Sequence, residues 1–174
     1  SFLKTKENYQ FLALNDALTG LVNRNTLHQR LKDRVKSAEQ KPFGLMLINL
    51  RQFRHINDSL GHSTGDLLLQ EVALRLNKIV WKSDTVACLG GDEFAIFMPY
   101  LANQVDISIV AEKVKEDLLK GFQVAGIPLY VEARIGIAVY PTHGLDADKI
   151  WMNADIALSV AKNKQKIIHI YNEE

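Results

Sequence analysis

The stretch "TVACLGGDEFAIFM", residues 85–98, decides the fold that we expect for this chain. Two short apolar segments, 85–89 and 93–98, flank the pair Gly90-Gly91. Glycine readily adopts the positive φ angles that a tight two-residue turn requires. The pattern therefore predicts a β-hairpin whose strands join at the glycine pair.

Two carboxylates, Asp92 and Glu93, directly follow the glycines and have two interpretations. Acidic residues beside turns are usually just solvated. Alternatively they belong to a metal and phosphate site, because Mg²⁺ prefers one or two carboxylates together with phosphate oxygens. The second interpretation is favoured by polar residues that gather in and after the apolar run ending near residue 50, beside two glycines: Asn49, Asn57, Asp58, His62 and Asp66.

Working outward from the hairpin, apolar periodicity and breaker residues predict alternating helices and strands. Helices are expected over residues 1–14, 23–37 with Asn23 as the cap, 67–80, 105–119 and 147–162. Single strands are expected over 43–50 and 167–171. A second hairpin, made of two strands, is expected within 122–140. Because hairpins require antiparallel pairing, this order predicts an α/β (α+β) fold with a mixed sheet flanked by helices.

Composition limits the class of protein. With 174 residues, 47% hydrophobic and 24% charged, the chain suits one globular domain rather than a disordered or fibrous protein. A net charge of +1 argues against a nucleic-acid-binding surface, and the single Cys88 excludes an internal disulfide and suits a reducing compartment. Its apolar runs are far shorter than the roughly 20 residues of a membrane span. The sequence begins at Ser1, without an initiator Met and without a signal-peptide pattern. We therefore expect a fragment of a longer protein whose neighbouring domains are missing.

Four blocks occur in order along the chain: "DALTGLVNR" (16–24), "FRHINDSLGHSTGD" (53–66), "GGDEF" (90–94) and "NADIALSVAK" (153–162). Together they closely resemble the GGDEF family, the diguanylate cyclases and their degenerate relatives. The resemblance implies a central five-stranded mixed sheet surrounded by helices, related to polymerase palms and nucleotidyl cyclases, with an extra hairpin. It implies one GGDEF domain over 16–174, preceded by a helix over 1–15 that links to an upstream module.

The resemblance also implies a reaction. Two GTP-loaded domains face each other as a homodimer, and the ribose 3′-hydroxyl of each GTP attacks the α-phosphate of the other. The products are cyclic di-GMP and two pyrophosphates, and the cofactor is Mg²⁺ or Mn²⁺. By resemblance Asp92 binds the metal, Glu93 binds a second metal or helps to deprotonate the hydroxyl, and the backbone carbonyl of Leu50 is a further ligand.

The remaining implied site residues bind GTP. Asn57 and Asp66 match the positions that recognise guanine, for which a carboxylate suits the neighbouring N1–H and N2–H donors. Phe53 and Arg54 match the phosphate-binding turn. Lys162 and Lys166 match basic positions that hold the triphosphate, and they would project from one helical face if the helix reached Lys166.

The chain departs from the family pattern at several of these positions. Asn49 and Arg51 stand where the family has Asp-x-Asp, so a neutral amide replaces the other main metal ligand and metal binding should weaken. Arg51 then repels Mg²⁺, pairs with phosphate in its place, or is merely solvated. Cys88 replaces the usual Arg and is expected to be a small buried hydrophobe. Of the family's Arg-x-x-Asp inhibitory site only Asp84 remains, so feedback by cyclic di-GMP through that site is not expected.

These departures leave three hypotheses. The first is a degenerate domain that binds GTP, makes little or no cyclic di-GMP, and regulates or dimerises a neighbouring domain. The second is an active diguanylate cyclase working as a homodimer, and the third is a structural domain without nucleotide binding. The C-terminal part also resembles the subclass that is followed by an EAL phosphodiesterase domain. We therefore expect a bacterial, cytoplasmic domain within a longer protein. The upstream part of that protein would be a sensory module, which could be anchored in a membrane.

Overall fold

A five-stranded sheet of order β2-β3-β1-β6-β7 forms the centre of the computed structural model, which describes residues 2–37 and 41–172. Its strands are β1 (Phe43–Arg51), β2 (Thr85–Gly90), β3 (Glu93–Met98), β6 (Glu132–Tyr140) and β7 (Ile168–Ile170). β6 and β7 pair in parallel, while β2, β3, β1 and β6 pair antiparallel. The mixed sheet expected from the sequence is confirmed.

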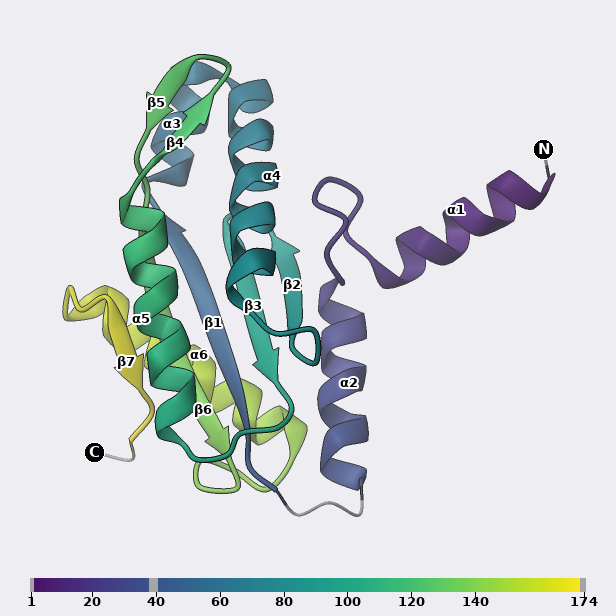
Figure 1. Ribbon diagram of the computed structural model, residues 1–174, viewed down its shortest axis with the longest axis vertical. Helices are drawn as coiled ribbons and strands as arrows, with labels where there is room; N and C mark the ends of the chain where they lie inside the picture. Colours follow the sequence, from purple (N-terminus) through teal and green to yellow (C-terminus); the bar gives the residue numbers. More distant parts are fainter. Residues whose placement is uncertain (1, 38–40, 173–174) are drawn as a thin grey trace.

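Helices cover both faces of this sheet (Figure 1). On one face α4 (His62–Ile79) and α5 (Val105–Leu119) pack over a core that includes Met46 and Ile48. On the other face α2 (Arg24–Lys36) and α6 (Ala147–Asn163) pack over a core that includes Leu45 and Leu47. β1 is therefore buried on both sides along most of its length, as its nearly unbroken apolar run predicts.

α2 begins where the sequence predicts, because Asn23 caps it by accepting a hydrogen bond from the amide of Thr26 at 2.9 Å. Later in the helix Arg34 is only 6% exposed. Its Nε donates to the carbonyl of Pro99 at 2.8 Å and its Nη2 to the carbonyl of Lys41 at 2.6 Å. A buried arginine thus fastens α2 to the ends of two strands.

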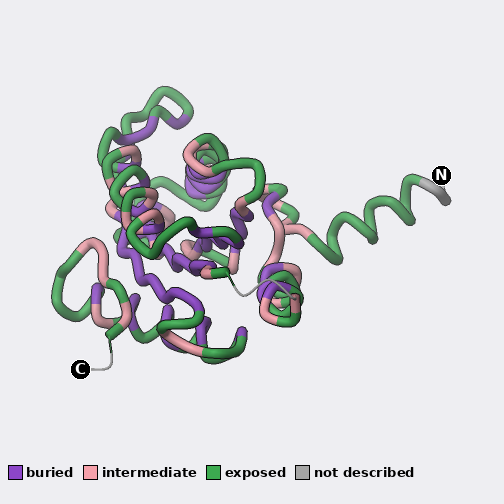
Figure 2. The backbone as a smooth tube through the Cα atoms, turned by 60° about the horizontal axis from the view of Figure 1, so that its bottom comes forward, coloured by how far each residue is buried: buried purple, intermediate pink, exposed green. Residues whose placement is uncertain are grey.

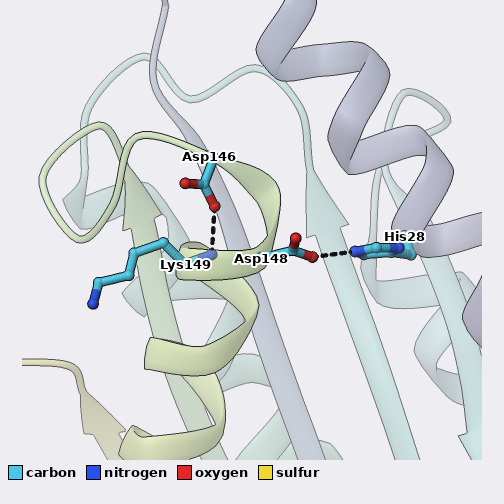
Figure 3. A network of polar contacts seen from close by, with 4 residues as sticks. All are labelled: His28, Asp146, Asp148 and Lys149. Carbon is cyan, nitrogen blue, oxygen red and sulfur yellow. Dashed lines mark hydrogen bonds and ion pairs between the residues drawn. The ribbon is translucent and has the colours of Figure 1, made fainter.

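α2 and α6 are also joined by polar contacts at the start of α6 (Figure 3). His28 Nε2 lies 2.6 Å from Asp148 Oδ1, linking the two helices directly. Asp146 caps α6 by accepting a hydrogen bond from the amide of Lys149 at 2.8 Å. Residues far apart in the sequence are therefore held together on this face of the sheet.

Close packing between α6 and β6 depends on Gly136. A Cβ placed there would overlap the backbone nitrogen of Leu158 and lie 2.6 Å from the carbonyl oxygen of Ala154.

Near the end of β6, His143 Nδ1 accepts a hydrogen bond from the amide of Val139 at 2.8 Å. Burial lowers the pKa of His143, because the charged imidazolium is poorly solvated there.

α1 (Phe2–Leu14) projects away from the domain and is exposed along its described side chains (Figure 2). Its end is nevertheless anchored. Asn23 donates from its backbone to Leu14 at 3.0 Å and from its side chain to Ala13 at 3.0 Å, and Thr26 Oγ1 donates to Leu14 at 2.7 Å. Among the described residues no helix combines the length and apolar character needed to cross a membrane.

Three sequence-based boundaries need correction. Gly90 pairs with Glu93, so the hairpin turn comprises Gly91 and Asp92 instead of the two glycines. The pair predicted within 122–140 is instead a separate hairpin of β4 (Phe122–Val124) and β5 (Ile127–Leu129), while β6 joins the main sheet.

The third correction concerns the polar passage before residue 67. It forms α3 (Phe53–Leu60), and α4 already begins at His62. Phe53 and Ile56, three apart on α3, are buried and give this short helix an apolar face. The predicted limits at Ser1 and Glu174 lie outside the described residues.

Candidate functional site

A cavity of about 430 Å³ lies where β1 ends, next to the β2–β3 turn and the last turn of α6. It is lined by six residues that the sequence singled out: Asn49, Leu50, Arg51, Arg54, Asp92 and Lys162. They come from the end of β1, the start of α3, the hairpin turn and the end of α6. The fold therefore brings together the residues expected to form one site.

The hairpin turn is held against the end of β1. The amide of Leu50 donates to the carbonyl of Asp92 at 2.9 Å, and Asn49 lies opposite Glu93 in the β1–β3 register. Leu50 is only 1% exposed because its side chain lies in the core, so its backbone is the part that can serve the cavity. Main-chain hydrogen bonding therefore joins the acidic turn to the end of β1.

Glu93 has a cationic partner that the sequence analysis missed. Arg24 Nη2 lies 3.7 Å from Glu93 Oε2, and the guanidinium carbon lies 5.5 Å from the centre of the Trp151 ring. Arg24, Trp151 and Asp155 line a neighbouring hollow of about 400 Å³ between α2 and α6. Burial raises the pKa of Asp155, and Arg24 and Lys162 partly offset that rise.

Positive charge dominates the main cavity. Its lining includes the cations Arg51, Arg54, Arg134 and Lys162, against one carboxylate, Asp92. Arg134 was not anticipated, although its only sequence signal, a charged residue within the apolar strand "EARIGIAVY", was visible. The arrangement suits an anion better than a metal cation.

A carboxylate outside the cavity lining balances part of this charge. Glu132 Oε2 lies 3.4 Å from Arg51 Nη1 and 3.5 Å from Arg134 Nη2. Arg51 is about half exposed, with 48% of its side chain accessible. Arg51 is therefore both solvent-accessible and paired with Glu132.

The donor set is poor for a divalent cation. Asn49 offers a neutral amide oxygen, and Glu93 already pairs with Arg24. Within residues 2–37 and 41–172, no group of three His, Cys, Asp or Glu side chains is arranged to hold a metal ion. Magnesium favours carboxylate oxygens, so these residues do not fit a tightly bound resident metal.

A second polar feature lies where α3 packs against α4. Asn57 Oδ1 is buried and finds no hydrogen-bond partner among the described residues. A Cβ placed at Gly65 would overlap Asn57 Oδ1 and lie 2.9 Å from Asn57 Cγ, so glycine makes room for this amide. Asp66, the next residue, is exposed. A buried acceptor without a partner calls for an explanation, and the exposed carboxylate beside it makes this a candidate ligand-binding position.

The remaining predicted residues lie elsewhere. Phe53 is 5% exposed in the core, so only its backbone is available to a phosphate. α6 ends at Asn163, and the amide of Lys166 bonds the carbonyl of Ala161 at 3.0 Å beyond the helix. Lys162 and Lys166 therefore do not share a helical face, because the chain turns at Gln165, whose φ is 54°.

Two positions tied to family departures behave as structural residues. Asp84 Oδ2 accepts a hydrogen bond from the amide of Trp81 at 3.0 Å, and burial raises the pKa of this carboxyl. Cys88 is 5% exposed, and burial likewise raises the pKa of its thiol. The expectation that Cys88 is a buried hydrophobe is confirmed.

Comparison with known proteins identifies the family. The family model described as "Diguanylate cyclase, GGDEF domain" matches residues 13–167. The bifunctional diguanylate cyclase/cyclic di-GMP phosphodiesterase MucR of Pseudomonas aeruginosa is 37% identical over 155 residues, covering 88% of this chain and 22% of MucR. The cyclic di-GMP phosphodiesterase PdeR of Escherichia coli is 31% identical, covering 91% of this chain and 24% of PdeR. The chain thus spans about a fifth to a quarter of these relatives.

Solved structures agree. The GGDEF domain of TpbB from Pseudomonas aeruginosa superposes with a TM-score of 0.87 at 31% identity, covering 91% of this chain and 94% of that one. A sensory box/GGDEF family protein from Caulobacter crescentus gives a TM-score of 0.81 at 34% identity, covering 87% and 99%. The resemblance seen in the four sequence blocks is confirmed: this chain belongs to the GGDEF family of diguanylate cyclase domains.

Proposed function

We propose that this domain binds GTP in the cationic cavity, forms cyclic di-GMP weakly or not at all, and regulates or dimerises an adjacent domain. The observation that carries the proposal is the position of Asn49. It stands between Glu93 on β3 and Arg134 on β6, where the family resemblance implies a metal-binding carboxylate. The site keeps its nucleotide-facing groups but has lost negative charge where the metal would bind.

Electrostatics argue for weak catalysis. At an effective dielectric near 20, one unit charge pair at about 4 Å is worth roughly 4 kcal/mol, and about twice that for a divalent ion. Replacing Asp by Asn49 removes one such attraction, and Arg51 and Arg134 add repulsion. Glu93 is further neutralised by Arg24. Because Mg²⁺ affinity should fall by several kcal/mol, metal-dependent turnover should fall with it.

Guanine recognition is supported by the α3–α4 contact. Asn57 carries a buried acceptor without a partner, which a base N–H can satisfy. The carboxylate of Asp66 can accept hydrogen bonds from the neighbouring N1–H and N2–H groups of guanine. Adenine offers no such pair of donors on that edge, so this arrangement favours GTP over ATP.

Phosphate binding is supported by the cavity itself. Arg54 and Lys162 line it, and α3 begins at Phe53 without a side-chain cap on its first amides. Uncapped amides at a helix start favour negative charge. Lys166 remains a proposed contact for the triphosphate from the turn after α6.

A regulatory role is suggested by the size of the relatives. MucR and PdeR carry names that include cyclic di-GMP phosphodiesterase activity, and this chain matches only part of each. We infer that the domain, beginning near Asp16, lies between an upstream sensory module joined through α1 and a downstream EAL domain. GTP bound here would then tune the hydrolysis carried out by its neighbour in the bacterial cytoplasm.

One observation favours a second candidate function, an active homodimeric cyclase. Asp92 and Glu93 are both present at the hairpin tip, and the turn is fixed to β1 through Leu50. In that case two GTP-loaded domains face each other, and each 3′-hydroxyl attacks the partner's α-phosphate with loss of pyrophosphate. Mg²⁺ or Mn²⁺ would be held by Asp92, Glu93 and the Leu50 carbonyl.

Turnover separates the two candidates. The protein, dimerised by a fused coiled coil, is incubated with GTP and Mg²⁺ or Mn²⁺, and cyclic di-GMP is quantified by chromatography. We expect GTP to raise the melting temperature but little product to form, whereas robust turnover would favour the cyclase. The double substitution Asn49→Asp with Arg51→Asp should raise Mn²⁺ affinity, while Asn77→Asp on the exposed face of α4 should not. Absence of any GTP-induced stabilisation would leave only a structural role.

A further inference from the structure

Arg134 is a charged residue in an unusual position, the interior of a sheet strand. It is only 5% exposed, and its neighbours Ala133 and Ile135 belong to the core. Burying a guanidinium is unfavourable unless it is well paired. Its ion-pair partner in the described chain is Glu132, at 3.5 Å, and that carboxylate is itself 46% exposed. This ion pair is long and accessible to water. The Arg134 guanidinium therefore remains able to bind an anionic ligand.

Strand register places this charge beside the acidic turn. Residues directly opposite one another on paired strands project from the same face of a sheet. Asn49 lies opposite Glu93 on one side and opposite Arg134 on the other, and Arg51 lies opposite Glu132. Arg134 therefore stands next to the neutral amide that replaces a metal-binding carboxylate.

One carboxylate cannot neutralise both arginines. Glu132 contacts Arg51 at 3.4 Å and Arg134 at 3.5 Å, so this group of three side chains keeps a net positive charge. Both arginines line the cavity, together with Lys162. A divalent cation entering there meets repulsion, whereas phosphate oxygens meet guanidinium groups whose planar donors match them in pairs.

We propose that Arg134 and Arg51 supply the positive charge that a divalent cation would otherwise bring, so that the polyphosphate of a nucleotide binds this domain without metal. The proposal rests on the proposed function, in that GTP is taken as the nucleotide. It deepens that function by making occupancy depend on GTP concentration and not on Mg²⁺. Glu132 is a counterion that offsets part of the charge of both guanidinium groups and so competes with phosphate for them.

The test measures GTP affinity by isothermal titration calorimetry with excess EDTA and with excess Mg²⁺. We expect the two dissociation constants to agree within about threefold. Arg134→Met, which keeps a long apolar side chain, should weaken metal-free binding by about tenfold or more. The matched control is Arg75→Met, which removes a cation paired with Asp117 at 3.5 Å beside a different cavity. It should leave GTP affinity unchanged.

A second variant keeps the proposal falsifiable if Arg134→Met fails to fold. Glu132→Gln removes the shared counterion at a half-exposed position, so metal-free binding should tighten, and an unchanged or weaker affinity would overturn the proposal. GTP binding that requires Mg²⁺ would also overturn it, while leaving the proposed function intact. If GTP does not bind at all, the proposed function fails. The inference is then tested by titrating tripolyphosphate into the protein in excess EDTA. Binding that Arg134→Met weakens supports it, and no binding, or binding indifferent to that substitution, refutes it.

Discussion

Replacing Gly65 by alanine should weaken GTP binding without harming the fold. The added Cβ would overlap Asn57 Oδ1 and lie 2.9 Å from Asn57 Cγ and 3.3 Å from Phe53 Cζ. The Asn57 amide, which can rotate, must then leave the position that we assign to guanine. Alanine is favoured over glycine inside a helix by about 1 kcal/mol, so α4 itself should gain stability.

The expected loss follows from one hydrogen bond. A neutral hydrogen bond contributes about 1 kcal/mol, which is roughly a fivefold change in the dissociation constant. Calorimetry with GTP and a thermal unfolding curve measure the two effects separately. Ser63→Ala, on an exposed position of the same helix, controls for helix propensity and should not change affinity.

A double-mutant cycle makes the reasoning refutable. Because Gly65→Ala acts by displacing Asn57, adding it to Asn57→Ala should cause little further loss of affinity. Fully additive losses would show that the two positions act independently. Wild-type affinity in a stably folded Gly65→Ala protein would place guanine recognition elsewhere.

Three further predictions concern stability. Gly136→Ala should lower the free energy of unfolding by roughly 1–3 kcal/mol or prevent folding, because the new methyl group overlaps the α6 backbone at Ala154 and Leu158. Urea denaturation measures this loss of stability. Arg34→Met should lower the same free energy by roughly 2 kcal/mol, since two main-chain carbonyl oxygens lose a buried donor. Burial lowers the pKa of His143, so the unfolded chain binds a proton at higher pH than the folded one. Stability should therefore fall as pH drops below about 6.5, and His143→Gln should show a smaller fall between about pH 7.5 and pH 5.5.

Much of the architecture could be predicted from local patterns. The Asn23 cap and the apolar run of β1 each specify a local conformation and appear where expected, and the glycines before Asp92 predict the β2–β3 hairpin although its turn lies one residue later. Errors arose where a conformation gives no sequence signal. Ala125 adopts a φ of 49°, a rare value for alanine, and with Gly126 forms the tight turn that joins β4 to β5.

The candidate site was predictable only in part. Asn49 and Asp92 could be found because one closes an apolar run and the other directly follows a glycine pair. Arg24 and Arg134 could not, because their importance comes from contacts with Glu93 and from register across β1. Pairing between distant residues is a property of the folded chain, and a single sequence carries no record of it.

The anchoring of α1 has a mechanical consequence. Its last carbonyl oxygens, at Ala13 and Leu14, accept hydrogen bonds from Asn23 and Thr26 at the start of α2. Arg24, which contacts Glu93 of the acidic turn, lies between those two anchors. A torque applied to the projecting helix must therefore turn the start of α2 with it or break these hydrogen bonds. As long as these hydrogen bonds hold, a movement of α1 should shift Arg24 and, through it, the contact with Glu93.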